Sequence, residues 1–275
     1  MDSIQSIVDY DEELPVTNRH DIYSTIDPKE AFANQTYRGK VVLVTGASRG
    51  IGQETAITYA KAGENVAITG RSQETLDKTA AIIHAAVSSA QVLAVPADVR
   101  DPKATEAAIQ ATLERFGRLD VLIANAGALS DFNQKLGDKV PDQWWNTFEV
   151  NVRGVYNTAR ASISALEKTS GRIVVISSKS AQFRDPHGSD YAISKHAINR
   201  LVEFIALEYP NGRCHMIFDT LQLPAATILY LTSGRLDWLN GKYLTATWDI
   251  SEVERDWKEK VQAGGVLINK LAIPK

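Results

Sequence analysis

The sequence predicts an α/β protein built on a doubly wound parallel sheet with helices on both faces. Short β-branched runs alternate with longer helix patterns, which is typical of parallel strands joined by crossover helices. The first run is apolar throughout and ends in glycines, as expected for a buried parallel strand. In chain order, strands are expected at 40–45, 65–69, 91–96, 119–124 and 172–177, and helices at 51–62, 73–88, 102–116, 142–167 and 191–208.

The length of 275 residues suits one large α/β domain better than two ordinary ones. With 44% hydrophobic and 23% charged residues, the chain has the composition of a globular protein. Its net charge of −3 gives no broad attraction to nucleic acid or to an anionic membrane, so neither is expected as a partner. We expect an acidic N-terminal extension over residues 1–38 and a single folded domain over residues 39–275.

The chain has one cysteine, Cys214, so an internal disulfide is impossible and no metal site is predicted. A single thiol suits a reducing compartment. No apolar run approaches the roughly 18 residues of a membrane span, and the acidic N-terminus does not resemble a secretion signal. The expected location is therefore the cytoplasm.

A glycine-rich turn connects the first strand to its helix. Glycine is needed where a backbone turns tightly and where it approaches a pyrophosphate closely. The following helix directs free N–H groups and the positive end of its dipole at the phosphates. The turn therefore predicts a nucleotide site, and its expected contact residues are Gly46, Ser48, Arg49, Gly50, Ile51 and Gly52.

The same turn allows a second interpretation. Residues 46–50 match G-x-S-x-G, the nucleophile elbow of α/β-hydrolases, with Ser48 as the nucleophile. This strand opens the sheet, whereas an elbow normally follows several earlier strands, and an elbow leaves Gly52 unexplained. The hypothesis stays open because four later histidines could supply a base: His84, His187, His196 and His215.

The end of the second strand indicates which dinucleotide is bound. A carboxylate usually stands there to accept hydrogen bonds from the ribose of NAD. Here the strand ends in Thr69 and Gly70, and Arg71 follows. A guanidinium can hold a 2′-phosphate through paired hydrogen bonds, and Arg49 is expected to approach the same phosphate. The sequence therefore favours NADP, although each arginine alone would be an ordinary surface residue.

Tyr191 and Lys195 are spaced to share one face at the start of a helix. A nearby ammonium favours the phenolate and lowers the tyrosine pKa, so such a pair can exchange a proton with a substrate oxygen. An isolated match of this kind arises by chance. Ser178, however, ends the fifth strand, where a hydroxyl could polarise a carbonyl. Ser177 and Ser180 are alternatives, and all three serines could be simple strand-end caps.

Other polar residues are expected at the same edge of the sheet. Asn125, Ala126 and Gly127 end the fourth strand. Asp98 and Val99 follow the third strand, where they could reach an adenine. Functional groups gather at this edge because parallel strands have their carboxyl ends together.

With these motifs in order, the chain resembles the short-chain dehydrogenase/reductase family over residues 40–208. The resemblance implies a Rossmann-type fold and hydride transfer between a nicotinamide and a carbonyl or alcohol carbon. It makes Tyr191 the acid–base, Ser178 the residue that positions the substrate oxygen, and Lys195 the residue that holds the ribose and tunes Tyr191. It also implies that Asn151 keeps a water in a proton relay and that the protein is a homo-oligomer. For Asn151, a local helix hydrogen bond is an equal alternative.

The chain departs from the family after residue 212. The expected Pro-Gly turn and variable substrate loop are missing, so we expect the sixth strand to be lost or shortened. Residues 213–218 could form a short strand, 221–231 look like the late helix, and 241–246 look like the final strand. A stripe of Trp248, Val253, Trp257 and Val261 predicts a docking helix.

Three hypotheses follow. The first is an NADP-dependent oxidoreductase acting on a small ketone or secondary alcohol, with turnover impaired because the missing segment leaves the substrate poorly enclosed. The second is a nucleotide-binding pseudoenzyme. The third is a serine hydrolase using Ser48.

Overall fold

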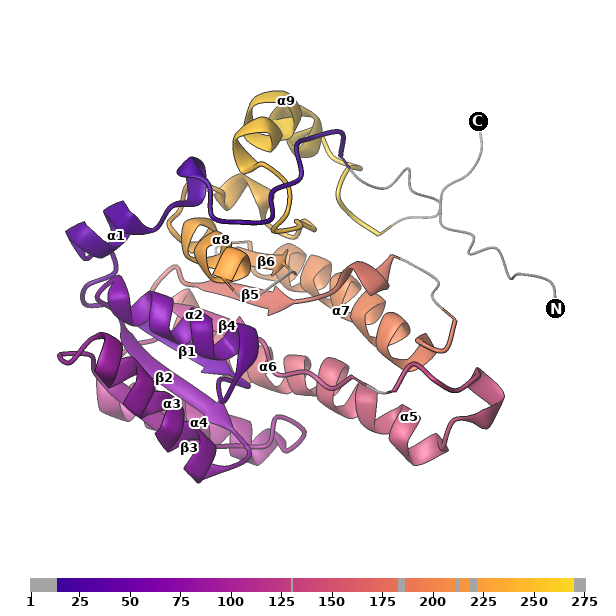
Figure 1. The fold of residues 1–275 in the computed structure, drawn as a ribbon, viewed down its shortest axis with the longest axis horizontal. Helices are drawn as coiled ribbons and strands as arrows, with labels where there is room; N and C mark the ends of the chain where they lie inside the picture. Colours follow the sequence, from indigo (N-terminus) through magenta and orange to yellow (C-terminus); the bar gives the residue numbers. More distant parts are fainter. Residues whose placement is uncertain (1–13, 130, 183–185, 211–212, 218–221, 270–275) are drawn as a thin grey trace.

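The structure, a computed structural model, describes residues 14–129, 131–182, 186–210, 213–217 and 222–269. Its centre is a six-stranded sheet in which every paired strand runs parallel to its neighbour (Figure 1). The doubly wound α/β fold is therefore confirmed. In sheet order the strands are β3 (Val92–Pro96), β2 (Asn65–Gly70), β1 (Val41–Thr45), β4 (Val121–Ala124), β5 (Arg172–Ile176) and β6 (Arg213–Ile217).

The strand order places β1 beside β4, so the chain first winds outward in one direction and then in the other. Ligands of such sheets bind outside the carboxyl ends of the strands at this reversal. The helices that connect the strands are α2 (Gly50–Lys61), α3 (Gln73–Ala86), α4 (Pro102–Phe116), α5 (Pro141–Phe148), α6 (Gly154–Glu167) and α7 (Ser189–Glu208). Helix α1 (Lys29–Asn34) precedes β1, and α8 (Gln222–Thr232) and α9 (Ile250–Gln262) follow β6.

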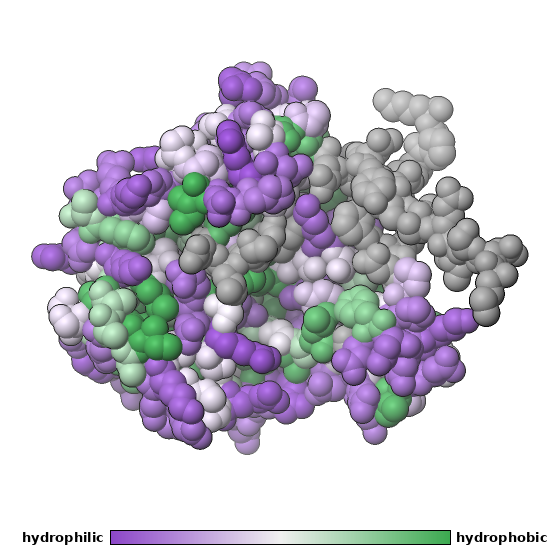
Figure 2. All heavy atoms as spheres, viewed as in Figure 1, coloured by the Kyte–Doolittle hydropathy of each residue, from purple (hydrophilic) through white to green (hydrophobic). Residues whose placement is uncertain are grey.

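Two apolar clusters lie on the two faces of the sheet, because successive residues of a strand point to opposite sides. In β1, Val42 and Val44 belong to one cluster, and Val41 and Leu43 belong to the other. The first cluster includes side chains of α2, α3, α8 and α9, and the second includes side chains of α4, α6 and α7. On the face drawn in Figure 2, hydrophobic atoms form small separate groups among hydrophilic ones.

The single helix expected at 142–167 is divided into three segments. A π-helical segment, Glu149–Arg153, joins α5 to α6 without interrupting the helical backbone. Asn151 lies in the middle of this segment. Single π-turns inside α-helices often occur at functional sites, so the irregularity marks the neighbourhood of Asn151 for attention.

The sixth strand is present and as long as β5, so the expectation that it is lost or shortened is wrong. All five residues of β6 pair with the five residues of β5, from Arg213 beside Arg172 to Ile217 beside Ile176. The late helix is found as α8. The final strand expected at 241–246 is wrong, because this segment lies outside every named strand and is buried in the first cluster.

Residues 14–23 of the N-terminal extension and α9 lie against each other above α8 (Figure 1). Asn18 forms an isolated antiparallel bridge with Trp248, and Arg19 pairs with Asp249 at 2.6 Å. Ile26 and Tyr37 of the extension are buried in the first cluster. The described part of the extension therefore packs on the domain. Among the described residues, every helix is too short or too polar to cross a bilayer.

Candidate active site

Asn125 joins the carboxyl ends of β1 and β4. Its side-chain Nδ2 donates to the carbonyl oxygens of Thr45 (2.8 Å) and Gly46 (3.1 Å). In return, the Thr45 hydroxyl oxygen accepts from the backbone N–H groups of Asn125 and Ala126, each at 3.0 Å. These four bonds fix the glycine turn against the tip of β4. The sequence placed Asn125 correctly but did not single out Thr45 as its partner.

The turn after β1 needs glycine at two positions, where it packs closely against the loop after β4. Gly46 has a φ of +64°, and a Cβ there would lie 2.8 Å from the Ala126 Cα. A Cβ on Gly52 would collide with the Asn125 side chain. The helix α2 begins at Gly50, and its N-cap residue Arg49 makes no side-chain capping bond. The turn and the helix N-terminus therefore fit the pyrophosphate of a dinucleotide.

The residues expected near the adenosine end lie on neighbouring loops. Arg49 and Arg71 are exposed, and neither forms an ion pair with a carboxylate of the described residues. Asp98 pairs with Arg100 at 2.6 Å, which holds the pKa of its carboxyl below the ordinary value, and Arg71 adds a smaller effect in the same direction. The side chain of Val99 is buried against Gly154 at the start of α6. A Cβ on Gly154 would be 2.6 Å from it, so Val99 is held by packing.

Tyr191 and Lys195 lie on α7 at the carboxyl ends of β4 and β5. The Lys195 Nζ is 5.6 Å from the centre of the Tyr191 ring. Tyr191 is partly buried, which raises its pKa, and a hydrogen bond with the Ser178 side chain opposes this effect. Ser178 also accepts a bond from the Ser180 N–H at 3.1 Å, so it caps the turn as well as facing Tyr191. Ser177 points elsewhere, donating to Asn199 at 2.6 Å.

Lys195 is 4% exposed, and burial lowers the pKa of its ammonium to about 8. Its Nζ donates to the Ile176 carbonyl at the tip of β5, at 2.7 Å. A Cβ built on Gly127 would lie 3.8 Å from this nitrogen and 3.4 Å from the Asn151 Oδ1. The lysine and the asparagine therefore meet beside the loop that follows β4.

Asn151 is fully buried and makes three bonds outside its own helix. Its Oδ1 accepts from the Ala128 N–H at 2.7 Å, and its Nδ2 donates to the Ala128 carbonyl at 3.0 Å. The same Nδ2 donates to the Ser194 hydroxyl at 2.9 Å. Asn151 thus ties the loop after β4 to α7 beside Lys195. Ser194 is a site neighbour that the sequence did not single out.

The hydrolase hypothesis requires a histidine within reach of Ser48, and no such bond exists in the described residues. The nitrogens of His84, His196 and His215 instead lie near the carbonyls of Ala90, Ala181 and Leu239, respectively. Burial lowers the pKa of His215 to about 4.

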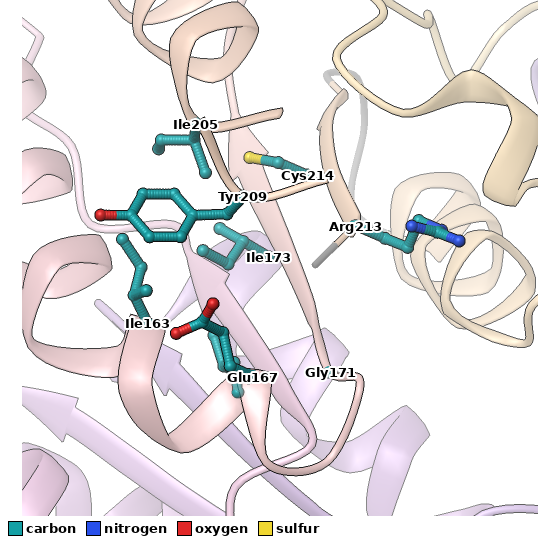
Figure 3. A pocket seen from close by; sticks show the side chains of 9 residues that line it. Ile163, Glu167, Gly171, Ile173, Ile205, Tyr209, Arg213 and Cys214 are labelled. Atoms are coloured by element: carbon teal, nitrogen blue, oxygen red, sulfur yellow. The ribbon is translucent and has the colours of Figure 1, made fainter. Parts of the chain in front are cut away.

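A small, partly open cavity lies at the amino ends of β5 and β6, away from Tyr191. It has a volume of about 20 Å³, room for a single water molecule, and almost wholly apolar walls from α6, α7, β5 and β6. In Figure 3 the Tyr209 ring and the Cys214 sulfur point into it, whereas the Arg213 guanidinium points away. It is too small to hold a substrate.

A family model described as short chain dehydrogenase matches residues 40–217. The chain is 34% identical to the short chain dehydrogenase pigC of Monascus ruber, over 89% of each chain. It is 33% identical to the short chain dehydrogenase citE of the same species, over 92% of this chain and 94% of citE. The protein therefore belongs to the short-chain dehydrogenase/reductase family, whose members are oxidoreductases that use NAD or NADP and act on small molecules.

Solved structures show the same fold. Levodione reductase superposes with a TM-score of 0.73 and 23% identity, covering 76% of this chain and 96% of the other. A short-chain type dehydrogenase/reductase from Mycobacterium marinum superposes with a TM-score of 0.72 and 25% identity, covering 78% and 96%.

Proposed function

We propose that this protein is an NADP-dependent oxidoreductase that transfers a hydride between the nicotinamide and the carbon of a ketone or secondary alcohol. The observation that carries the proposal is the buried Lys195 beside the partly buried Tyr191, at the edge of the sheet where the glycine turn also lies. A perturbed base next to an accessible acid, in a site open to ligands, is the arrangement that acid–base catalysis requires.

The residues of this chain would then divide the work as follows. The bound coenzyme supplies or accepts the hydride. The Tyr191 hydroxyl gives a proton to the substrate oxygen during reduction and takes it back during oxidation. Ser178 orients that oxygen through a second hydrogen bond. The positive charge of Lys195 favours the phenolate of Tyr191. Asn151 holds the loop after β4 against α7 beside Lys195, where it would keep a water in the proton relay.

Preference for NADP is supported by two exposed arginines and by the lack of an acid at the end of β2. Arg49 and Arg71 are not neutralised by ion pairs with the described carboxylates, so both remain free to bind a 2′-phosphate. Cytoplasmic location and homo-oligomeric assembly stay part of the proposal.

Turnover is proposed to be slower than the catalytic residues would allow. Only four residues separate the end of β6 at Ile217 from the start of α8 at Gln222, so little chain is available to cover the substrate. The match to pigC runs over 276 residues and yet includes 89% of this chain, so it spans positions at which this chain has no residue. Poor enclosure weakens positioning and water exclusion. Brisk turnover of a simple ketone would contradict this part of the proposal.

The experiment compares coenzyme binding with turnover in the wild type and in Tyr191→Phe. Thermal unfolding is measured with NADPH and with NADH at 1 mM, because a ligand of the folded state raises the melting temperature. We expect the larger rise with NADPH. We expect Tyr191→Phe to bind NADPH as the wild type does and to lose about 10²-fold or more of ketone-dependent NADPH oxidation. Failure of both coenzymes to bind would refute the proposal. Binding without turnover in the wild type would favour the pseudoenzyme.

A further inference from the structure

The segment 131–140, between β4 and α5, carries three exposed large apolar side chains at the catalytic edge of the sheet. Phe132 is 39% exposed, Leu136 is 65% exposed and Val140 is 47% exposed. Single exposed apolar side chains are ordinary, but ligand sites are lined mainly by apolar and aromatic groups. The position of this segment beside α7 decides whether its side chains can meet a substrate.

Phe132 packs directly against the start of α7. Its ring centre is 6.3 Å from that of Tyr191, with the rings inclined at 68°, an edge-to-face contact. A Cβ built on Gly188, the residue before α7, would collide with the Phe132 ring. The ring therefore lies on bare backbone, next to the tyrosine proposed to act on the substrate oxygen, and part of its surface stays open.

A buried ion pair fixes the end of the same segment to the same helix. The Lys139 Nζ donates to Asp190 Oδ1 at 2.8 Å, and the two side chains are 6% and 0% exposed. The Thr147 hydroxyl of α5 donates to the other Asp190 oxygen at 3.2 Å. Asp190 immediately precedes Tyr191, so the ion pair connects segment 131–140 to the residue beside the proposed acid–base.

Stability alone is a poor explanation for this pair. Taking two charges out of water costs about as much as their attraction returns, and apolar replacements of similar size are often neutral for stability. A buried pair does, however, impose one geometry on the elements that it joins. Here those elements are the loop with Phe132 and the helix with Tyr191.

We propose that Lys139 and Asp190 are a positioning pair that holds segment 131–140 on α7, and that Phe132 so held makes the site prefer ketones bearing an aromatic or similarly flat apolar group. This inference rests on the proposed function, because it takes Tyr191 to act at the substrate oxygen. A flat apolar group beside the carbonyl would pack on the open part of the Phe132 ring. A small aliphatic ketone would gain nothing from that ring.

The test measures how tightly acetophenone and acetone bind to the protein saturated with NADP⁺, or with NAD⁺ if only that coenzyme binds. Neither ketone can be reduced in this complex, so dissociation constants are read by calorimetry or ligand-observed NMR without turnover. We expect the wild type to bind acetophenone about tenfold or more tightly than acetone. Phe132→Ala should bring the ratio close to one, and Phe132→Leu should leave an intermediate ratio.

The ion pair is tested with the double variant Lys139→Met/Asp190→Asn, which removes both charges and leaves Thr147 an acceptor. Its acetophenone-to-acetone ratio should fall about as far as that of Phe132→Ala, while its melting temperature changes little. The matched control is Arg172→Met/Asp237→Asn, which removes an ion pair of 3.0 Å at the opposite edge of the sheet. This control should keep the wild-type ratio whatever its melting temperature.

The outcomes separate the two proposals. An unchanged ratio in folded Phe132→Ala or Phe132→Leu, or no preference in the wild type, overturns the Phe132 preference alone. A wild-type ratio in Lys139→Met/Asp190→Asn overturns the positioning role of the pair. Failure of both oxidised coenzymes to bind overturns the proposed function and this inference with it.

Discussion

Buried ionisable groups lie at the carboxyl ends and at the amino ends of the parallel strands, which we call the carboxyl edge and the amino edge of the sheet. The groups at these two edges have different surroundings. At the carboxyl edge, Lys195 is buried, and its ammonium donates to a backbone carbonyl beside Tyr191. At the amino edge, Glu64 is 2% exposed, and neither of its carboxylate oxygens has a hydrogen-bond partner among the described residues. Burial raises the pKa of Glu64 well above the ordinary value, and it does the same to the thiol of Cys214.

The difference shows that a perturbed pKa does not by itself mark a functional site. Lys195 meets Asn151 and Gly127 beside the loop that follows β4, and Tyr191 lies next to it. Cys214 lines only the small apolar cavity of Figure 3, and Glu64 is enclosed by the fold. A functional site needs access and converging polar groups in addition to an unusual pKa.

The largest effect that separates the two edges should come from Lys195→Met. Removing the ammonium takes away the charge proposed to favour the Tyr191 phenolate, so we expect kcat/KM for ketone reduction to fall about 10³-fold. Initial rates of NADPH oxidation measure this loss. The matched control is Glu64→Gln, another buried group with a shifted pKa, which should retain wild-type kcat/KM. Equal losses in both variants would contradict the division between the edges.

The same lysine should make stability rise with pH. Its folded pKa of about 8 is below the ordinary 10.5, so between these values the unfolded chain binds more protons. The burial penalty is therefore full below pH 8 and is relieved as the pH rises toward 10.5. We expect Lys195→Met to be more stable than the wild type at pH 7, by on the order of 2 kcal/mol. Urea unfolding at pH 7 and pH 10 should show this advantage shrinking.

A variant at the carboxyl edge should also change the preference between NADPH and NADH, whereas the groups at the amino edge should not affect it. Arg71→Ser removes a guanidinium proposed to bind the 2′-phosphate, so the KM for NADPH should rise about tenfold. The KM for NADH, which lacks that phosphate, should stay the same. An equal rise for both coenzymes would show that Arg71 only supports the loop.

The carboxyl edge was largely predictable from the sequence, because its residues follow strand ends in a fixed order. The glycine turn, Asn125, Ser178 and Tyr191 lie where parallel strands finish, and a parallel sheet brings those ends together. The meeting of Asn151 with Ser194 is less visible, because it depends on a π-helical turn that residue spacing does not reveal.

Contacts between segments far apart in the sequence were not predictable. Lys139 and Asp190 are 51 positions apart, and neither belongs to a motif. Residues 241–246 have the apolar pattern of a strand but belong to no named strand of the described chain, and Leu244 and Ala246 are buried in the first cluster. Pattern alone cannot tell a buried coil from a strand, because both need apolar side chains.

The smallest expected effect is the stability of Glu64→Gln, and its pH dependence is opposite to that of the lysine variant. Because the folded pKa of Glu64 is raised above 4.5, the folded state holds its proton more tightly than the unfolded chain. Stability from this group is full below pH 4.5 and is lost as the pH rises. The variant, which cannot ionise, should gain about 1 kcal/mol over the wild type at pH 8 and almost nothing at pH 4. Urea unfolding at both pH values measures the gap. A gap that narrows with rising pH would mean that the nearby Lys40, rather than burial and Asp120, controls the carboxyl.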